Sequence, residues 1–484
     1  MKQLLVIIFA TVLAYLNIFN NQLVVDDHIF VGKYSPSLTE AFSGVVPATH
    51  EGVYRPVRGL FFTVYSRLWG SNPLGYHLNS LLVHLISTVL VYFIVKSLIL
   101  NFKLQTSGGL PFVAALLFGL HPVHTETITY IASGMDSIGL VFFLAAFYCY
   151  LRGKIIASLA LALAAFFTTE MSLTLPLFII FYDWVAGKLA KNKITVYGWF
   201  GTAAALYLIV RFTVLHITTR GPYLAGSFYL TMLTMTKVVL QYLKVLLWPV
   251  NLMSNHIISP GIEAFVYRNY RTAAIAAQSI FDVEILLSAV VISILIWLIW
   301  RLQKSHPLIS FGIGTFFLGL LPVMELVPQG SMMNERFLYI SSFGLVLITA
   351  FVILQLKNKK LIIFLTCLLV IFYGARTISR NRDWHDDISL WQADVNQSPT
   401  ENAYTYFALG NAYNDRKEYK PAIEQYAKSV EINPGFAVGW ASLGRTYADM
   451  GKTAEAIANY KQALAIDPDF QEVKINLSNI YQGL

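Results

Sequence analysis

Charged residues are scarce in this chain. Only 13% of its 484 residues are charged and 56% are hydrophobic, whereas a soluble protein carries about a quarter charged residues. Long apolar runs recur from Leu4 to about Ile378. The net charge of +8 comes from Lys and Arg in the short connectors between these runs, so it reports membrane topology, and no nucleic-acid partner is expected. The composition predicts an all-α, polytopic protein of the lipid bilayer.

The sequence also gives no sign of disulfides or of a signal-peptide cleavage site. The two cysteines, Cys149 and Cys367, both fall within predicted spans, so the parts outside the membrane are expected to do without disulfides. No Ala-x-Ala-like site follows the first apolar run, Leu4–Asn20, which is close to spanning length. We therefore predict an uncleaved first span.

Eleven apolar runs are expected to span the membrane, which makes residues 1–378 a single membrane domain. Pro176 interrupts the sixth run, which is tolerable if neighbouring groups satisfy the freed carbonyl. The predicted spans are Leu4–Asn20, His77–Leu100, Gly109–Leu120, Met135–Leu151, Ile155–Thr168, Met171–Val185, Val196–Leu215, Val283–Trp300, Leu308–Val327, Phe337–Leu356 and Leu361–Ile378.

A twelfth apolar stretch, residues 228–250, is long enough to span, but Lys237 and Lys244 interrupt it on one helical face. If it lies in the outer interface and the N-terminus is cytoplasmic, every inner connector is basic, as the positive-inside rule requires. We therefore predict an interfacial helix at 228–250. The first outer loop, 21–76, and the C-terminal region then face outside. The three short outer connectors contain no Lys or Arg: His121–Gly134, Thr169–Glu170 and Pro328–Glu335.

The C-terminal region repeats with a period of 34 residues. Leu409, Gly410 and Pro434 are matched by Leu443, Gly444 and Pro468, which is typical of tetratricopeptide (TPR) repeats, short pairs of helices. Residues 403–484 are predicted to hold two full repeats and one further helix, after a connector helix at 379–402. So few repeats are marginal alone, so we expect them to pack on the connector or the membrane domain. Candidate groove residues for a protein or peptide acceptor are Tyr406, Asn411, Trp440 and Arg445.

Two adjacent acids, Asp26 and Asp27, follow the first span. Repulsion between neighbouring carboxylates raises at least one pKa or attracts a cation or an arginine. Such a pair at a membrane edge is a candidate general base, which takes a proton from an acceptor hydroxyl as the hydroxyl attacks a sugar carbon.

Other ionisable groups gather at the outer connectors, where such groups are costly and often functional. Arg55, Arg58 and Arg336 are candidates for holding a donor phosphate, because guanidinium groups bind phosphate through forked hydrogen bonds. A functional outer cavity also predicts pocket residues among the remaining groups. These are His121, His124, Glu126, Asp136, Glu170, Glu335 and Tyr339.

Metal binding is the competing use of these residues. Asp27 and His28 are the candidate ligands for a divalent cation, but the spacing matches no recognised metal pattern. No cofactor is required by the sequence.

Several of these stretches together resemble a known family. His121-Pro122-Val123-His124-Thr125-Glu126 and Glu335-Arg336-Phe337-Leu338-Tyr339, with an Asp-Asp in the first outer loop and TPR units, are similar to the TMTC-type transmembrane and TPR-containing O-mannosyltransferases. That family belongs to the GT-C superfamily of glycosyltransferases. The resemblance covers nearly the whole chain.

The resemblance implies a polyprenyl-phosphate monosaccharide donor, with mannose the sugar in the eukaryotic branch. It implies that Asp26, with Asp27 beside it, is the catalytic base, and that the TPR array lies on the acceptor side. The chain departs from the family at Thr169, where a Lys is frequent, and in its shorter array. The short array and the absence of disulfides favour a bacterial inner-membrane protein with a periplasmic active site and TPR region.

The sequence thus favours an inverting membrane glycosyltransferase that acts on an extracytoplasmic protein hydroxyl. Two other interpretations stay open. The same donor could serve a glycolipid or polysaccharide acceptor, or the membrane part could anchor a non-enzymatic TPR scaffold.

Overall fold

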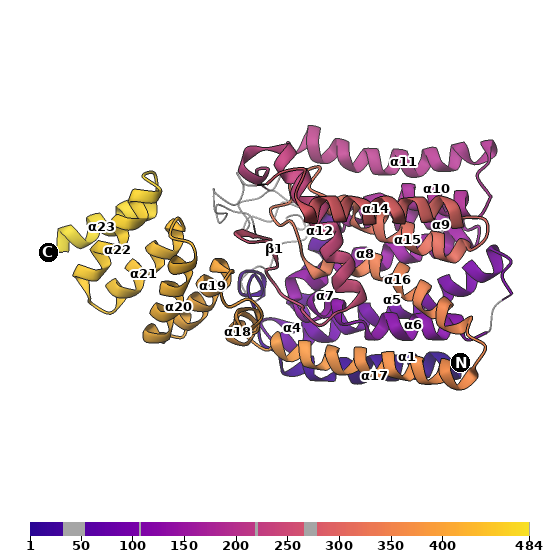
Figure 1. Cartoon of the computed structure of the whole chain (residues 1–484), viewed down its shortest axis with the longest axis horizontal. Coiled ribbons are helices and arrows are strands. Elements are labelled where there is room, and N and C mark those ends of the chain that lie inside the picture. The colour runs from indigo at the N-terminus through magenta and orange to yellow at the C-terminus, as the bar shows by residue number, and fades with distance from the viewer. Residues whose placement is uncertain (32–53, 106–107, 218–220, 266–277, 484) are drawn as a thin grey trace.

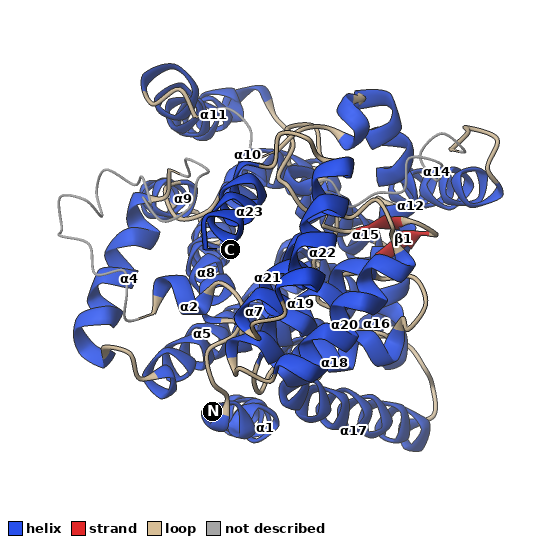
Figure 2. Ribbon diagram, turned by 90° about the vertical axis from the view of Figure 1, so that its left-hand side faces the viewer, coloured by secondary structure: helices blue, strands red, loops and turns tan. Residues whose placement is uncertain are grey.

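The protein consists of a bundle of helices with a smaller helical array at one end. The computed structural model describes residues 1–31, 54–105, 108–217, 221–265 and 278–483. Figure 1 shows the long helices of the bundle side by side, with the N-terminus at the end of the bundle that lies away from the C-terminal array. Figure 2 views the molecule from the side of that array, so that several of the bundle helices are seen end-on.

Eight helical segments in the described part of the chain are long and apolar enough to cross a membrane. Three of them include short 3-10 or π-helical turns at their ends. The segments are Lys2–Asn20 with α1 (Lys2–Tyr15), α5 (Pro73–Asn101), α8 (Ile131–Leu151), Lys191–Val214 with α11 (Ile194–Ile209), α12 (Phe228–Leu247), α14 (Val283–Leu302), Glu335–Leu354 with α16 (Tyr339–Leu354), and α17 (Lys359–Asp383).

Shorter helices fill the interior of the bundle and the end that lies next to the array. We call this end the outer end, because the sequence predicts that it faces outside. Three are apolar and of intermediate length: α6 (Leu110–Leu120), α9 (Ile155–Phe166) and the segment Pro307–Val323, which holds α15 (Pro307–Leu320). The others are α2 (Asp27–Phe30), α4 (Pro56–Trp69), α7 (Thr125–Thr129) and α10 (Leu175–Val185). All eleven predicted spans coincide with helical segments, seven of them among the eight long ones, and the chain is a multi-pass membrane protein.

Proline marks the start of several of these helices. Pro73, Pro111, Pro176 and Pro307 all lie in the first turn of a helix, where the missing N–H would have had no intrahelical partner. Pro176 therefore breaks no hydrogen bond inside a span, because α10 begins at Leu175.

Helix α12 contacts outer connectors along its whole length. Tyr223, just before it, donates from its hydroxyl to the Leu326 carbonyl at 3.1 Å. The Tyr242 hydroxyl accepts from the Asn334 N–H at 3.1 Å. At its far end the Leu246 carbonyl lies 3.2 Å from His121 Nε2. A spanning helix would meet outer connectors at one end only, so these contacts favour a helix that lies across the outer end of the bundle.

The array consists of α19 (Ala403–Asp415), α20 (Tyr419–Ile432), α21 (Ala437–Asp449), α22 (Thr453–Ile466) and α23 (Gln471–Gly483). The connector at 379–402 is divided, instead of forming one helix. The membrane helix α17 continues to Asp383, and a separate helix, α18 (Asp387–Gln397), follows. The break has a local cause, because the Asp386 side chain accepts from the Ser389 N–H at 2.8 Å and caps α18.

The first repeat packs on the membrane domain. We call residues 21–31, which carry Asp26 and Asp27, the acid loop. One apolar core joins residues of the acid loop and of α8 to Trp384, Trp391 and Leu409. A short hairpin, β1 (Ile257–Ser259) and β2 (Ile262–Glu263), adds polar contacts. The buried Glu263 carboxylate accepts from the N–H groups of Ala403 at 2.9 Å and Tyr404 at 3.2 Å. The first repeat is therefore packed against the outer end of the bundle, as we expected for so few repeats.

The repeat glycines provide a test of this packing. A Cβ at Gly410 would lie 2.5 Å from the Tyr426 ring, whereas one at Gly435 would meet nothing closer than 3.5 Å. Gly410→Ala should lower the free energy of unfolding of the first repeat by about 1–3 kcal/mol, because overpacked contacts force side chains off their rotamers. Hydrogen exchange in α19 and α20 would measure it. Equal exchange in Gly410→Ala and the control Gly435→Ala would contradict the expected close approach.

Candidate active site

The two acids after the first span differ in their surroundings. Asp27 is fully buried, and its carboxylate accepts from the N–H groups of Ala132 at 2.7 Å, Ile131 at 3.3 Å and Val24 at 3.3 Å. It therefore caps the N-terminus of α8. Burial raises the pKa of Asp27, and the three backbone donors oppose that rise.

Asp26 is exposed. One of its carboxylate oxygens accepts from the Tyr130 hydroxyl at 2.8 Å, and the Tyr130 ring stacks on Trp384 with centroids 5.6 Å apart. Burial and the charges of Asp26 and Asp27 raise the pKa of Tyr130, so this hydroxyl stays protonated and keeps donating. Asp26 is thus oriented and open to a reactant, whereas the oxygens of Asp27 are used by the backbone.

Arginines and carboxylates alternate along one wall of the outer cavity. The Glu170 carboxylate lies between two arginines, with Oε1 2.7 Å from Arg211 and Oε2 2.6 Å from Arg55. Asp136 Oδ1 lies 2.8 Å from Arg55 and 3.0 Å from Arg58. We call this chain, Arg211–Glu170–Arg55–Asp136–Arg58, the charge ladder. Its members come from α4, α8, the turn before α10 and the π-helical turn Val210–Val214.

The opposite wall carries a fourth arginine. Arg336 NH1 lies 2.6 Å from Glu126 Oε1, and the Arg336 N–H donates to Glu126 Oε2 at 3.0 Å. The Arg336 side chain is 23% exposed, whereas Glu126 is 3% exposed. Burial raises the pKa of Glu126, and the Arg336 charge opposes the rise.

A small pocket lies between these walls. Its charged lining comes from the ladder and from Arg336. Arg55 and Arg336 line the pocket with Asp136 and Glu170, and Arg58, Arg211 and Glu126 pair with these residues from outside the lining. The whole set of four arginines and three carboxylates carries one more positive charge than negative. The lining residues are Arg55, Asp136, Glu170, Met171, Pro322, Val323, Gln329, Ser331, Arg336 and Phe337. Such a pocket suits a ligand with one negative charge and an apolar part.

Three of the predicted pocket residues, His121, His124 and Tyr339, are buried between helices and do not line this pocket. His124 Nε2 is 2.8 Å from the Ser342 hydroxyl, and the Tyr339 hydroxyl is 2.8 Å from His84. His121 is fully buried beside the end of α12. Burial lowers the pKa of His121 to about 3 and lowers that of His124, so both rings are neutral and packed among aromatic side chains.

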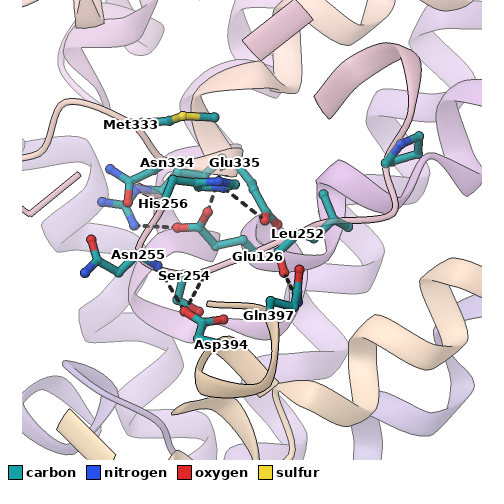
Figure 3. Close-up of polar contacts among 12 residues, drawn as sticks. Glu126, Leu252, Ser254, Asn255, His256, Met333, Asn334, Glu335, Asp394 and Gln397 are labelled. Carbon is teal, nitrogen blue, oxygen red and sulfur yellow. Dashed lines mark hydrogen bonds and ion pairs between the residues drawn. The ribbon is translucent and has the colours of Figure 1, made fainter. Parts of the chain in front are cut away.

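Glu335 belongs to a buried polar network at the base of the array, drawn in Figure 3. Its Oε1 lies 3.4 Å from His256 Nε2 and 3.6 Å from Arg380 NH2. Asp394 of α18 accepts from the N–H groups of Ser254 at 2.8 Å and Asn255 at 3.0 Å. Arg380 NH1 lies 3.9 Å from Asp394. The network joins the connector that carries Arg336 to the first helix outside the membrane domain.

The predicted metal ligands do not converge. The Asp27 carboxylate is occupied by backbone N–H groups, and His28 Nε2 lies 2.7 Å from Asp387. Among the residues described, no three His, Cys, Asp or Glu side chains are close enough together to hold a metal ion. These side chains therefore do not fit the divalent cation that the sequence left open.

The four predicted groove residues differ in how far they are exposed and in their hydrogen bonds. Tyr406 is buried and donates to the Pro399 carbonyl at 2.9 Å. Asn411 accepts from the Tyr426 hydroxyl at 2.7 Å, and Trp440 donates to the Pro434 carbonyl at 3.0 Å. Arg445 is exposed, so of these four it is the most open to a partner.

Comparison with known proteins finds similarity in the array and along most of the chain. A TPR repeat model matches residues 444–484, and a tetratricopeptide repeat model matches residues 403–436. The protein O-mannosyl-transferase F38B6.6 of Caenorhabditis elegans is 24% identical over 462 residues, which cover 90% of this chain and 63% of that protein. The relatives of the present chain are thus TMTC-type protein O-mannosyltransferases.

Two vertebrate relatives extend this finding. Human protein O-mannosyl-transferase TMTC3 is 25% identical over 79% of this chain and 45% of its own length. Mouse TMTC1 is 37% identical over 110 residues, 22% of this chain and 11% of its own. The chain thus spans less than two thirds of these relatives. The solved structure titled "Crystal structure of MamA" aligns with 24% of this chain and 67% of its own at 23% identity, but its TM-score of 0.20 carries no weight.

Two charged residues of the site were missed from the sequence although a signal existed. Arg211 and Glu325 are each the only charge in their predicted spans, Val196–Leu215 and Leu308–Val327. A lone charge in a span is costly and points to a functional or buried role. Glu325 has a positive φ of 55° and accepts from the Gln329 N–H at 3.1 Å, so it shapes the connector that lines the pocket. Tyr130 gave no such signal.

The buried Glu325 should make the free energy of unfolding of the protein depend on pH. Burial raises the pKa of Glu325 to about 7, above the usual value of about 4.3 for glutamate. The folded protein then retains a proton that the unfolded chain releases, so the free energy of unfolding falls as the pH rises from about 4 to 7. Glu325→Gln lacks this proton. Relative to wild type, its unfolding free energy should rise by about 2–3 kcal/mol between pH 4.5 and pH 8.

Denaturant unfolding of both proteins in detergent across this pH range measures the difference. The opposite sign, with Glu325→Gln losing stability relative to wild type as the pH rises, or a pH-independent difference, would contradict a buried, protonated Glu325.

Proposed function

We propose that this chain is an inverting glycosyltransferase that moves one sugar, mannose-like, from a polyprenyl-phosphate donor to a protein hydroxyl outside the cytoplasm. The observation that carries the proposal is an oriented, exposed carboxylate, Asp26, near a pocket whose charged lining is Arg55, Arg336, Asp136 and Glu170. The charges of Asp26 and Arg336 both act on Tyr130, which lies between them. The names of the relatives support a protein acceptor. The TPR array, packed beside Asp26, fits the side from which such an acceptor would arrive.

The donor fits the charge of the pocket. A polyprenyl-phosphate sugar is a phosphodiester with one negative charge, and the two walls leave one positive charge. When the bond from the anomeric carbon to the phosphate oxygen breaks, the leaving phosphate gains a second negative charge. Arg55, Arg211 and Arg336 can stabilise that developing charge, because preformed donors in a dry site act most strongly where charge appears.

Asp26 serves as the base. The acceptor hydroxyl gives its proton to Asp26 as its oxygen attacks the anomeric carbon opposite the phosphate, so the configuration inverts. Tyr130 orients the carboxylate. Asp27 holds the start of α8, which carries Asp136 of the ladder. No step requires a metal ion. We further propose the inner membrane of a bacterium as the location, with Asp26 and the array on the periplasmic side.

The two acids should behave differently when substituted. Asp26→Asn should reduce transfer by about 10²–10⁴-fold, since this is the usual contribution of a general base, and should leave thermal stability unchanged. Asp27→Asn should lower stability, because it weakens the cap on three backbone N–H groups. Label transfer from a panel of polyprenyl-phosphate sugars to protein and glycolipid acceptors, with and without chelator, measures the first effect. Undiminished transfer by Asp26→Asn would refute the base.

Arg211 should matter for the donor. Arg211→Gln leaves Glu170, which lines the pocket, with one fewer cation. The pocket then becomes less positive, so the donor KM should rise at least about tenfold. The control is Arg67→Gln, the same change of charge at an exposed position of α4. Equal kinetics for the two variants would place the donor phosphate elsewhere.

A further inference from the structure

The segment that carries Asp26 is held from outside by the connector to the array. The Gln22 N–H donates to the His385 carbonyl at 2.8 Å, and the Asn21 side chain donates to the Asn381 carbonyl at 2.9 Å. These two contacts fix the approach to the acid pair. Neither touches Asp26 itself. Tyr130 orients the Asp26 carboxylate at its tip, and the backbone that carries this side chain is held by a further contact.

One side chain spans the segment Val25–His28. Asp387, the first residue of α18, accepts from the Val25 N–H through Oδ1 at 2.8 Å. Its Oδ2 lies 2.7 Å from His28 Nε2. The two oxygens of one carboxylate therefore bridge the residues on either side of the acid pair.

The bridge holds a strained backbone. Val25 has a φ of 52°, in the left-handed region that β-branched residues rarely adopt. Such a conformation persists only where surrounding contacts impose it. A relaxed Val25 would rotate the peptide that leads to Asp26, so the bond from Asp387 bears directly on the direction of that carboxylate.

The same turn is bonded to the array. Asp386 caps α18, and its Oδ2 accepts from Arg416 NH2 at 2.9 Å. Arg416 follows α19, the first helix of the first repeat. A continuous set of contacts therefore runs from the first repeat through Asp386 and Asp387 to Val25 and Asp26.

We propose that Asp387 is a positioning residue for Asp26, and that with Asp386 and Arg416 it couples the TPR array to the base. This rests on the proposed function, in which Asp26 takes the acceptor proton. An acceptor protein bound to the first repeat would thereby act on the geometry of the base as well as on its own delivery. Asp387 itself touches neither substrate.

The test uses the full-length protein and separates kcat from KM. Asp387→Ala should lower kcat about 10–100-fold with the donor KM unchanged, because the pocket stays intact. Asp387→Asn keeps an oxygen for the Val25 N–H and should retain most of the kcat. Asn396→Ala, an exposed change on the same helix, is the control and should match wild type. An unchanged kcat in Asp387→Ala would overturn the proposal.

A suppressor distinguishes positioning from mere stability. Glycine adopts a positive φ without strain, so Val25→Gly combined with Asp387→Ala should recover at least part of the lost kcat. A structural role for Asp387 alone predicts no recovery, and a double variant no better than Asp387→Ala would overturn the mechanism. Arg416→Ala should lower kcat several-fold with a protein acceptor, and a wild-type value would overturn the link to the array.

Hydrogen exchange keeps this test separate from the proposed function. Asp387→Ala should speed hydrogen exchange of the amides of residues 24–30 whether or not sugar transfer is measured. Unchanged exchange would show that the Asp387 bridge does not hold this segment. Asp26→Asn is assayed in parallel. If Asp26→Asn is active, the base assignment fails. If it is inactive and Asp387→Ala is fully active, the positioning proposal alone fails.

Discussion

Alternating buried charge is the constraint on which the outer end of this protein depends. Each carboxylate of the charge ladder lies between two arginines, so the loss of either carboxylate would leave an arginine without its ladder partner in a site of low dielectric. The ladder draws together α4, α8, the turn before α10 and the end of the α11 segment, which are far apart in sequence. The charges that would bind a donor therefore also hold the bundle together at its outer end. The ladder and the Arg336–Glu126 pair together hold four arginines and three carboxylates, and this excess of one positive charge suits an anion.

The second constraint is the continuity between the membrane domain and the array. An apolar core, the Glu263 contacts with the start of α19 and the network around Arg380 make the first repeat part of the outer surface. A tail that hung freely could gather acceptors but could not influence the base. The turn between α17 and α18 touches both the loop that carries Asp26 and the first repeat, so the proposed acceptor binding and the proposed base would share one set of contacts.

Much of the architecture could be predicted because it follows from composition and local pattern. The helical spans and the repeat period depend on hydropathy and on a 34-residue spacing. The roles within the site could not be predicted so well. Adjacent acids look alike in a sequence, yet Asp27 is used by the start of α8 and Asp26 is open. His121 and His124 look like pocket residues, yet both are packed between helices. Arg211 was a lone charge in a span, a signal that was available and went unused.

By itself the sequence determined that the chain is a multi-pass membrane protein, that acids and arginines gather at one end of it, and that TPR helices follow. These properties depend on residue type and spacing along the chain. Only the tertiary structure decided which arginine faces which carboxylate, which of the two acids is exposed, and that Asp387 bridges the acid loop. The physical reason is that ion pairing and burial depend on distances between residues that lie 41 to 362 positions apart in the sequence, and the linear pattern does not encode those distances.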